Sequence, residues 1–170
     1  MIHFRMKNNI GSVTVVDRIL EMASLVLAVF LIVLAVALYR YLPEQIPIHF
    51  NAAGEPDGWG GKSFIYALPA LGVATMAICS VAAYNYKMVN LPFRLNPACL
   101  PQQVTLIGRM TRIISLLSGL LFIALMLMTA APQWGMQAVF FPFFLIVIAG
   151  MVVVLIIYAV LVYKKGRQYQ

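Results

Sequence analysis

The residues best suited to chemistry lie in one polar segment, residues 42–64, with the sequence LPEQIPIHFNAAGEPDGWGGKSF. Three of the chain's five acidic residues occur there beside one histidine: Glu44, Glu55, Asp57 and His49. Carboxylates and an imidazole this close together can bind a metal ion or move protons in catalysis. They can equally cap turns, form ion pairs or bind a ligand through hydrogen bonds.

The same segment has the composition of a small ordered cap, residues 43–63. IPIHF is a short extended stretch set off by Pro43 and Pro47, and NAAGEPDGWGG is dense in turn residues. Four glycines in it allow positive φ: Gly54, Gly58, Gly60 and Gly61. A loop of this length is usually functional or disordered, and its mixture of aromatic, apolar and turn residues favours order.

We hypothesise a ligand-binding surface made of His49, Asn51, Glu55, Asp57, Trp59 and Lys62. The alternative is structural, with Asn51 and Asp57 capping turns and Lys62 pairing with the carboxylates.

The composition predicts which kind of secondary structure carries this cap. Hydrophobic residues make up 63% of the 170 residues and charged residues 10%, whereas a soluble domain has about 45–50% and 25%. A soluble enzyme, a disordered chain and a disulfide scaffold are therefore disfavoured. Four apolar runs reach the ~20 residues that a membrane-spanning helix needs: residues 19–42, 64–86, 110–131 and 138–163. We predict an all-α membrane protein, with residues 1–170 forming one four-helix bundle.

The basic residues predict how the bundle is oriented. Ten of the twelve Lys and Arg residues flank the predicted helices on one side: Arg5, Lys7, Arg18, Lys87, Arg94, Arg109, Arg112, Lys164, Lys165 and Arg167. Arg40 and Lys62 flank them on the other side. The positive-inside rule then places both termini in the cytoplasm and the cap outside. Because the net charge of +7 lies in short segments between apolar runs, and not on one basic face, we predict no nucleic-acid partner.

A metal centre or a catalytic site is poorly supported. The second histidine, His3, is predicted on the side of the membrane opposite His49, and zinc sites usually draw on several His or Cys ligands. Cys79 lies in an apolar run and Cys99 in a predicted cytoplasmic loop, so neither is expected beside His49 of the cap. The chain contains no H-E-x-x-H, G-x-S-x-G or Walker sequence. We predict no metal, no cofactor and no enzymatic activity.

Ionisable residues inside the spans would indicate transport. Glu21 is the one candidate for an intramembrane carboxylate, and its position near the predicted cytoplasmic start of the first helix allows it to stay hydrated. Thr14 and Asp17 have the spacing of a capping box ahead of that helix. Pro69 either follows an ordered entry segment or lies within the second span.

The cap sequence resembles a known family. Residues 42–62 are similar to the pattern L-P-x-x-I-P-x-H-F-N-x-x-G-x-P-D-x-W-x-x-K. This pattern is found in a bacterial membrane-protein family of unknown function, whose domain is shared with the N-terminal part of Sdp-type immunity proteins. Those proteins protect a producing cell against its own secreted toxic peptide. The resemblance implies a small integral protein of the bacterial plasma (inner) membrane.

Two classes of function follow. The first is a non-enzymatic multi-pass protein in the lipid bilayer that recognises a secreted toxic peptide or a small ligand at its extracytoplasmic cap. The second is a small transporter or exporter working as a homo-oligomeric dimer, for which Glu21 is the membrane-embedded carboxylate. Signalling across the membrane is a variant of the first class, and a structural or assembly role is a further alternative.

Overall fold

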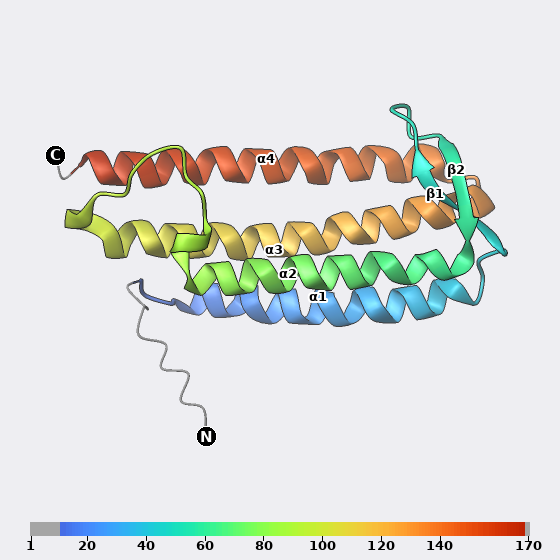
Figure 1. Ribbon diagram of the computed structural model, residues 1–170, viewed down its shortest axis with the longest axis horizontal. Coiled ribbons are helices and arrows are strands. Elements are labelled where there is room, and N and C mark those ends of the chain that lie inside the picture. The colour runs from blue at the N-terminus through green and yellow to red at the C-terminus, as the bar shows by residue number, and fades with distance from the viewer. Residues whose placement is uncertain (1–10, 169–170) are drawn as a thin grey trace, which may run out of the picture.

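Residues 11–168 are those that the computed structural model describes, and they form four long helices and one two-stranded sheet (Figure 1). The helices are α1 Val15–Tyr39, α2 Ala67–Tyr84, α3 Leu100–Ala130 and α4 Gln137–Arg167. The strands β1 Gln45–Phe50 and β2 Pro56–Gly61 form an antiparallel hairpin between α1 and α2. Short 3-10 helices cover Lys62–Tyr66, Tyr86–Met88, Pro97–Cys99 and Ala131–Trp134.

The four helices lie side by side along one axis, and the hairpin lies across one end of the bundle (Figure 1). We call this the hairpin end. At the opposite end α1 and α3 begin and α2 and α4 end. We call it the basic end, because it carries eight described basic residues: Arg18, Lys87, Arg94, Arg109, Arg112, Lys164, Lys165 and Arg167.

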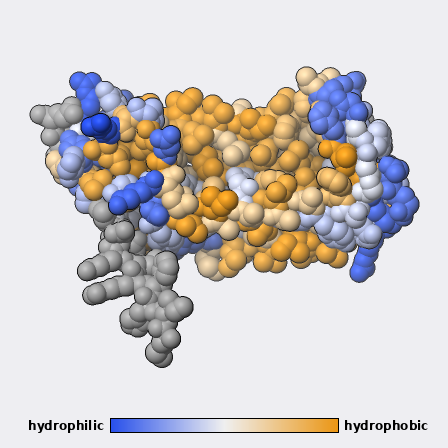
Figure 2. Space-filling view, viewed as in Figure 1, coloured by the Kyte–Doolittle hydropathy of each residue, from blue (hydrophilic) through white to orange (hydrophobic). Residues whose placement is uncertain are grey.

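Each of the four helices is long and apolar enough to cross a membrane. The space-filling view shows a broad hydrophobic belt between two hydrophilic ends (Figure 2). Large apolar side chains are exposed along this belt, including Leu25, Val33, Leu71, Ile146 and Ile156. A soluble protein does not expose an apolar surface of this extent. The predicted multi-pass membrane protein is therefore supported by the structure.

The structure differs from the sequence-based boundaries in two places. The third helix begins at Leu100, ten residues before the predicted start of its span at residue 110. The added turns contain the polar residues Gln102, Gln103 and Arg109. A hydropathy pattern detects only the apolar part of a helix, so it does not show that the helix extends into a polar segment. The all-α prediction also lacked the sheet, because the glycine-rich sequence of β2 has low strand propensity.

Helix α3 is the centre of the bundle, since it packs against α1, α2 and α4. Small residues allow the helices to approach closely. A Cβ added to Gly119 of α3 would lie 2.5 Å from Leu27 Cδ2 of α1, and one on Gly72 of α2 would lie 2.9 Å from Phe122 Cγ of α3. The fully buried side chains Leu31, Ile65 and Met126 complete the core towards the hairpin end.

Local sequence explains how two of the helices begin. The predicted capping box is confirmed: Asp17 N–H donates to Thr14 Oγ1 at 3.3 Å, and Thr14 N–H donates to Asp17 Oδ2 at 2.9 Å. Of the two alternatives for Pro69, the structure is nearer to the one with an entry segment, because the 3-10 helix Lys62–Tyr66 precedes α2. Helix α2 then begins at Ala67, so Pro69 lies in its first turn, where a missing N–H has no cost.

Candidate functional site

The hairpin positions five of the six residues of the hypothesised binding surface, and the sixth, Lys62, begins the 3-10 helix that follows it. Its register pairs Pro47 with Trp59 and His49 with Gly58, with irregularities on either side of His49. Small residues on β2 make room for the side chains of β1. A Cβ on Gly58 would lie 2.9 Å from His49 Cβ, and one on Gly60 would lie 3.0 Å from Ile48 Cδ1. These glycines therefore serve the strand pairing and do not form turns.

His49 and Asp57 meet across the two strands. His49 Nδ1 and Asp57 Oδ1 are in hydrogen-bonding contact, and the two side chains are 73% and 43% exposed. Trp59 follows Asp57 by two residues on β2, so both side chains lie on the same face of the strand. Trp59 is 55% exposed. The hairpin thus presents an imidazole–carboxylate pair beside an open indole, which we call the recognition face.

Asn51 and Glu55 form the turn between the strands. Asn51 Oδ1 accepts hydrogen bonds from the Ala53 and Glu55 N–H groups at 2.9 and 3.0 Å. Asn51 Nδ2 donates to Glu55 Oε2 at 3.0 Å. This is the local use of a short amide side chain that shapes turns. The turn-capping alternative therefore describes Asn51, and the predicted role of Asp57 in capping does not match its contact with His49.

Lys62 joins the base of the hairpin to α1. Its Nζ donates to Glu44 Oε1 at 2.6 Å and lies 5.0 Å from the centroid of the Tyr39 ring. The Lys62 N–H also donates to Glu44 O at 3.0 Å. Tyr39 in turn stacks at 5.0 Å on Tyr66. The pairing of Lys62 with a carboxylate, one of the two sequence-based interpretations, is what the structure contains.

The hairpin is docked on the bundle at both of its ends. Ile46 is 1% exposed and belongs to the same core as Leu31 and Ile65. At the far end, Gly54 has φ +80°, and a Cβ there would lie 2.4 Å from Phe141 Cγ of α4. An apolar cavity of about 120 Å³ lies beside β1, with Ile48, Phe64 and Leu71 among its walls. The hairpin is therefore packed against the core beside α1 at one end and against α4 at the other.

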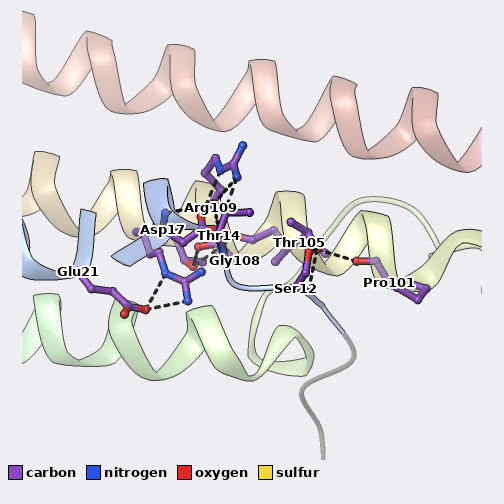
Figure 3. A network of polar contacts seen from close by, with 11 residues as sticks. Ser12, Thr14, Asp17, Glu21, Pro101, Thr105, Gly108 and Arg109 are labelled. Carbon is purple, nitrogen blue, oxygen red and sulfur yellow. Dashed lines mark hydrogen bonds and ion pairs between the residues drawn. The ribbon is translucent and has the colours of Figure 1, made fainter. Parts of the chain in front are cut away.

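A second polar site, at the basic end, was missed by the sequence analysis (Figure 3). Arg109 of α3 donates from Nε to Asp17 Oδ1 at 3.2 Å and from Nη2 to Thr14 Oγ1 at 3.0 Å. Asp17 is 1% exposed, so this carboxylate is buried in the bundle, where its contacts are with Arg109 and with the capping residue Thr14. The contact links residues 92 positions apart.

One turn further into the bundle, Arg112 pairs with Glu21. Arg112 Nε donates to Glu21 Oε1 at 2.8 Å, and Tyr84 Oη of α2 donates to the same oxygen at 2.5 Å. The Arg112 guanidinium also lies 4.9 Å from the Tyr84 ring centroid. Arg112 is 4% exposed, whereas the Glu21 side chain is 28% exposed. Glu21 is therefore held by two partners and not simply hydrated.

A sequence signal for this pairing exists. Asp17 and Glu21 are four residues apart on α1, and Arg109 and Arg112 are three apart on α3, so each pair lies on one face of its helix. Because α1 and α3 run in the same direction, the first carboxylate meets the first arginine and the second meets the second. The sequence-based prediction used Arg109 and Arg112 only as charges that flank a helix, and it therefore did not pair them with Asp17 and Glu21.

Within residues 11–168, no cluster of three or more His, Cys, Asp or Glu side chains has the geometry to hold a metal ion. His3, Arg5 and Lys7, used in the sequence-based arguments, lie outside the described residues. Cys79 and Cys99 are both free thiols.

Known proteins match part of the chain. A domain of unknown function (DUF1648) is found at residues 26–73. An uncharacterised protein of Archaeoglobus fulgidus is 36% identical over 53 residues, which are 31% of this chain and 29% of that protein. The chain thus spans less than a third of the relative's length. No solved structure matches it. The domain match contains the second half of α1, the whole hairpin and the start of α2, and it excludes Arg109 and Arg112.

Proposed function

We propose that this protein is a non-enzymatic membrane receptor that binds a ligand at the extracytoplasmic face of the plasma membrane. The ligand would contact the recognition face, which consists of His49, Asp57 and Trp59. The observation that carries the proposal is the exposure of these three side chains on a hairpin that is otherwise tied to the bundle. Asn51, Glu55 and Lys62 support the hairpin through their own contacts. A rigid hairpin lowers the entropy cost of binding, because its exposed groups are already oriented.

The distribution of charge supports an outward-facing hairpin. Of the described basic residues, only Arg40 and Lys62 are at the hairpin end. Such an asymmetry directs the basic end to the cytoplasm of a plasma membrane. The hairpin end carries three carboxylates, Glu44, Glu55 and Asp57, against Arg40 and Lys62, and Lys62 is paired with Glu44. The remaining carboxylates, Glu55 and Asp57, can attract cationic ligands by long-range electrostatics.

The ligand that fits this surface is a cationic, membrane-active peptide. Its basic groups would meet the carboxylates, and its apolar face would meet Trp59 and the exposed neighbours Ile48 and Phe64. Indole rings combine a large apolar area with a polar N–H, which suits contact with an amphipathic peptide. The resemblance of residues 42–62 to the Sdp-type family makes protection against a secreted toxic peptide the most concrete version of this role.

Growth protection tests this function. A sensitive bacterium expressing the chain is challenged with a panel of secreted cationic peptides, and survival is compared for His49→Ala, Asp57→Ala and Trp59→Ala. Tyr41→Ala is the matched control, because Tyr41 is 75% exposed at the same end but lies outside the hairpin. Protection by the wild type and the control, lost in the three variants at equal membrane abundance, is the expected result. Protection that survives all three substitutions would remove the recognition face from the function.

Transport is the second candidate, because Glu21 and Arg112 form an ion pair between helices long enough to cross a membrane. Paired ionisable groups within membrane-spanning segments often belong to transport pathways. A Glu21→Gln variant should then abolish the efflux or uptake of a substrate while the protein still reaches the membrane. Full transport by this variant would exclude a role for the carboxylate.

A further inference from the structure

A polar cavity of about 90 Å³ opens at the basic end, between the loop that precedes α3 and the last turns of α4. Its walls pair two arginines with two amides and two aromatic rings: Arg94 and Arg167, Asn96 and Gln103, Phe93 and Tyr163. It is separate from the recognition face, which lies at the hairpin end.

The walls of this cavity are fixed by hydrogen bonds that cross between elements. Gln103 is 1% exposed; its Nε2 donates to Val162 O of α4 at 2.9 Å, and its Oε1 accepts from the Asn96 N–H at 2.9 Å. Asn96 Nδ2 donates to Gly166 O at 2.8 Å. A Cβ on Gly166 would lie 2.7 Å from Gln103 Nε2, so a side chain there would displace the Gln103 amide from its present position. These hydrogen bonds connect the loop and α3 to α4 and fix the positions of the cavity walls.

The two arginines have no acidic partner among residues 11–168. All five carboxylates are engaged elsewhere: Asp17 and Glu21 with α3, and Glu44, Glu55 and Asp57 in or beside the hairpin. The negative end of α4 and the positive end of α3 both lie near the cavity, and their fields oppose each other. The positive potential of the cavity thus comes from Arg94 and Arg167.

The aromatic wall indicates where the cavity lies relative to a bilayer. Phe93 and Tyr163 pack edge to face with ring centroids 5.5 Å apart. Tyr163 is 48% exposed and follows the apolar part of α4 directly. Tyrosine at such a boundary prefers the headgroup level of a membrane. A basic pocket between helices on the positively charged side is where anionic headgroups bind.

We propose that this cavity binds a phosphate group, with the guanidinium groups of Arg94 and Arg167 as its ligands. Guanidinium forks match phosphate oxygens with paired, charge-assisted hydrogen bonds. The volume of the cavity accommodates a phosphate group, and a larger molecule carrying it would extend along Tyr163 to the apolar surface of α4. A lipid headgroup and free inorganic phosphate both offer this chemistry.

Binding is measured on the purified full-length protein in a neutral detergent, with two separate probes. One is short-chain phosphatidylglycerol, followed by native mass spectrometry, and the other is inorganic phosphate, followed by calorimetry. The Arg94→Gln/Arg167→Gln variant should bind the effective probe roughly tenfold more weakly or worse, since two charge-assisted hydrogen-bonding groups are lost. The variant should melt at the wild-type temperature without a probe, because both arginines are exposed.

The control variant, Arg18→Gln/Lys164→Gln, removes the same charge from the same end. Both of its residues are exposed and lie outside the cavity. Near wild-type binding by this control, with loss in the arginine variant, supports the site, and the probe that binds identifies lipid or free phosphate as the source. Equal weakening of both variants would mean non-specific attraction and overturn the proposal, as would the failure of both probes to bind the wild type.

Discussion

Arg112 of α3 lies with its Nη2 atom 2.8 Å from Oε1 of Glu21 on α1, and this ion pair joins two helices through residues that are 91 positions apart in the chain. The arginine is almost completely buried, whereas the carboxylate keeps partial access to solvent. Removing water from a charged group is costly unless a partner compensates it. Leaving the buried arginine without its partner should therefore lower the free energy of unfolding more than leaving the partly exposed carboxylate without its partner.

This inequality predicts the order of stability of three variants. Glu21→Leu leaves a buried guanidinium without its counterion and should lower the free energy of unfolding by about 3 kcal/mol, near the lower end for a broken buried pair. Arg112→Met should cost less, because Glu21 can be hydrated where it stands. The double variant should be more stable than Glu21→Leu alone. Chemical unfolding in detergent micelles measures all three, and a double variant equal to the sum of the single losses would contradict the coupling.

The start of α1 gives a second stability prediction. Thr14→Ala removes the hydroxyl that accepts from the Asp17 N–H and from Arg109 Nη2. The loss of a helix N-cap costs about 0.5–2 kcal/mol, and the loss should lie in the upper half of this range because Arg109 also loses an acceptor. Thr14→Ser keeps the hydroxyl and is the control. Melting temperatures in detergent check the order, and equal effects of serine and alanine would show that the hydroxyl contributes nothing.

The success of the capping prediction and the failure to foresee the arginine pairs have the same physical origin. A capping box is complete within residues 14–17, so neighbouring residue types are sufficient to identify it. The partners of Arg109 and Arg112 lie on another helix, and a sequence does not state which helices are adjacent. The matching spacings on α1 and α3 become meaningful only when these helices are known to be in contact and to run in the same direction.

The hairpin was predicted in part for similar reasons. The extended stretch ending at Phe50 is recognisable from its alternating, β-prone residues, and β1 covers it. The partner strand is hidden by its glycines, which on their own suggest turns. Among the cap glycines, all of them described, Gly54 alone has positive φ. His49 and Asp57 were assigned to one surface, but their direct contact depends on an irregular register that no spacing rule specifies.

The membrane orientation is testable by cysteine labelling in intact cells. In a Cys79→Ala/Cys99→Ala background, Ala52→Cys places a thiol at the exposed tip of the hairpin, and Gln168→Cys places one at the basic end. The positive-inside rule predicts that a membrane-impermeant maleimide labels the first variant in intact cells and the second only after permeabilisation. The reverse pattern would place the hairpin in the cytoplasm and withdraw the proposed encounter with a secreted peptide.

The docking of the hairpin tip on α4 can be separated from the conformation of the tip itself. Gly54 and Gly135 both have positive φ, at +80° and +63°. A Cβ on Gly54 would collide with Phe141, whereas one on Gly135 would have no atom within 4 Å. Both Gly→Ala changes therefore add the backbone strain of a left-handed alanine, about 1 kcal/mol, but only Gly54→Ala also displaces the hairpin.

The displacement should be visible at Trp59 and in protection by the receptor. Gly54→Ala should shift the Trp59 fluorescence, read in a Trp134→Phe background, and should raise the rate of proteolysis between β1 and β2. Gly135→Ala should lower stability slightly and leave both signals unchanged, because Gly135 lies in the turn before α4. If the docked orientation of the recognition face is what binds the peptide, Gly54→Ala loses growth protection and Gly135→Ala keeps it. Equal behaviour of the two variants in fluorescence and proteolysis would mean that contact with Phe141 does not hold the hairpin.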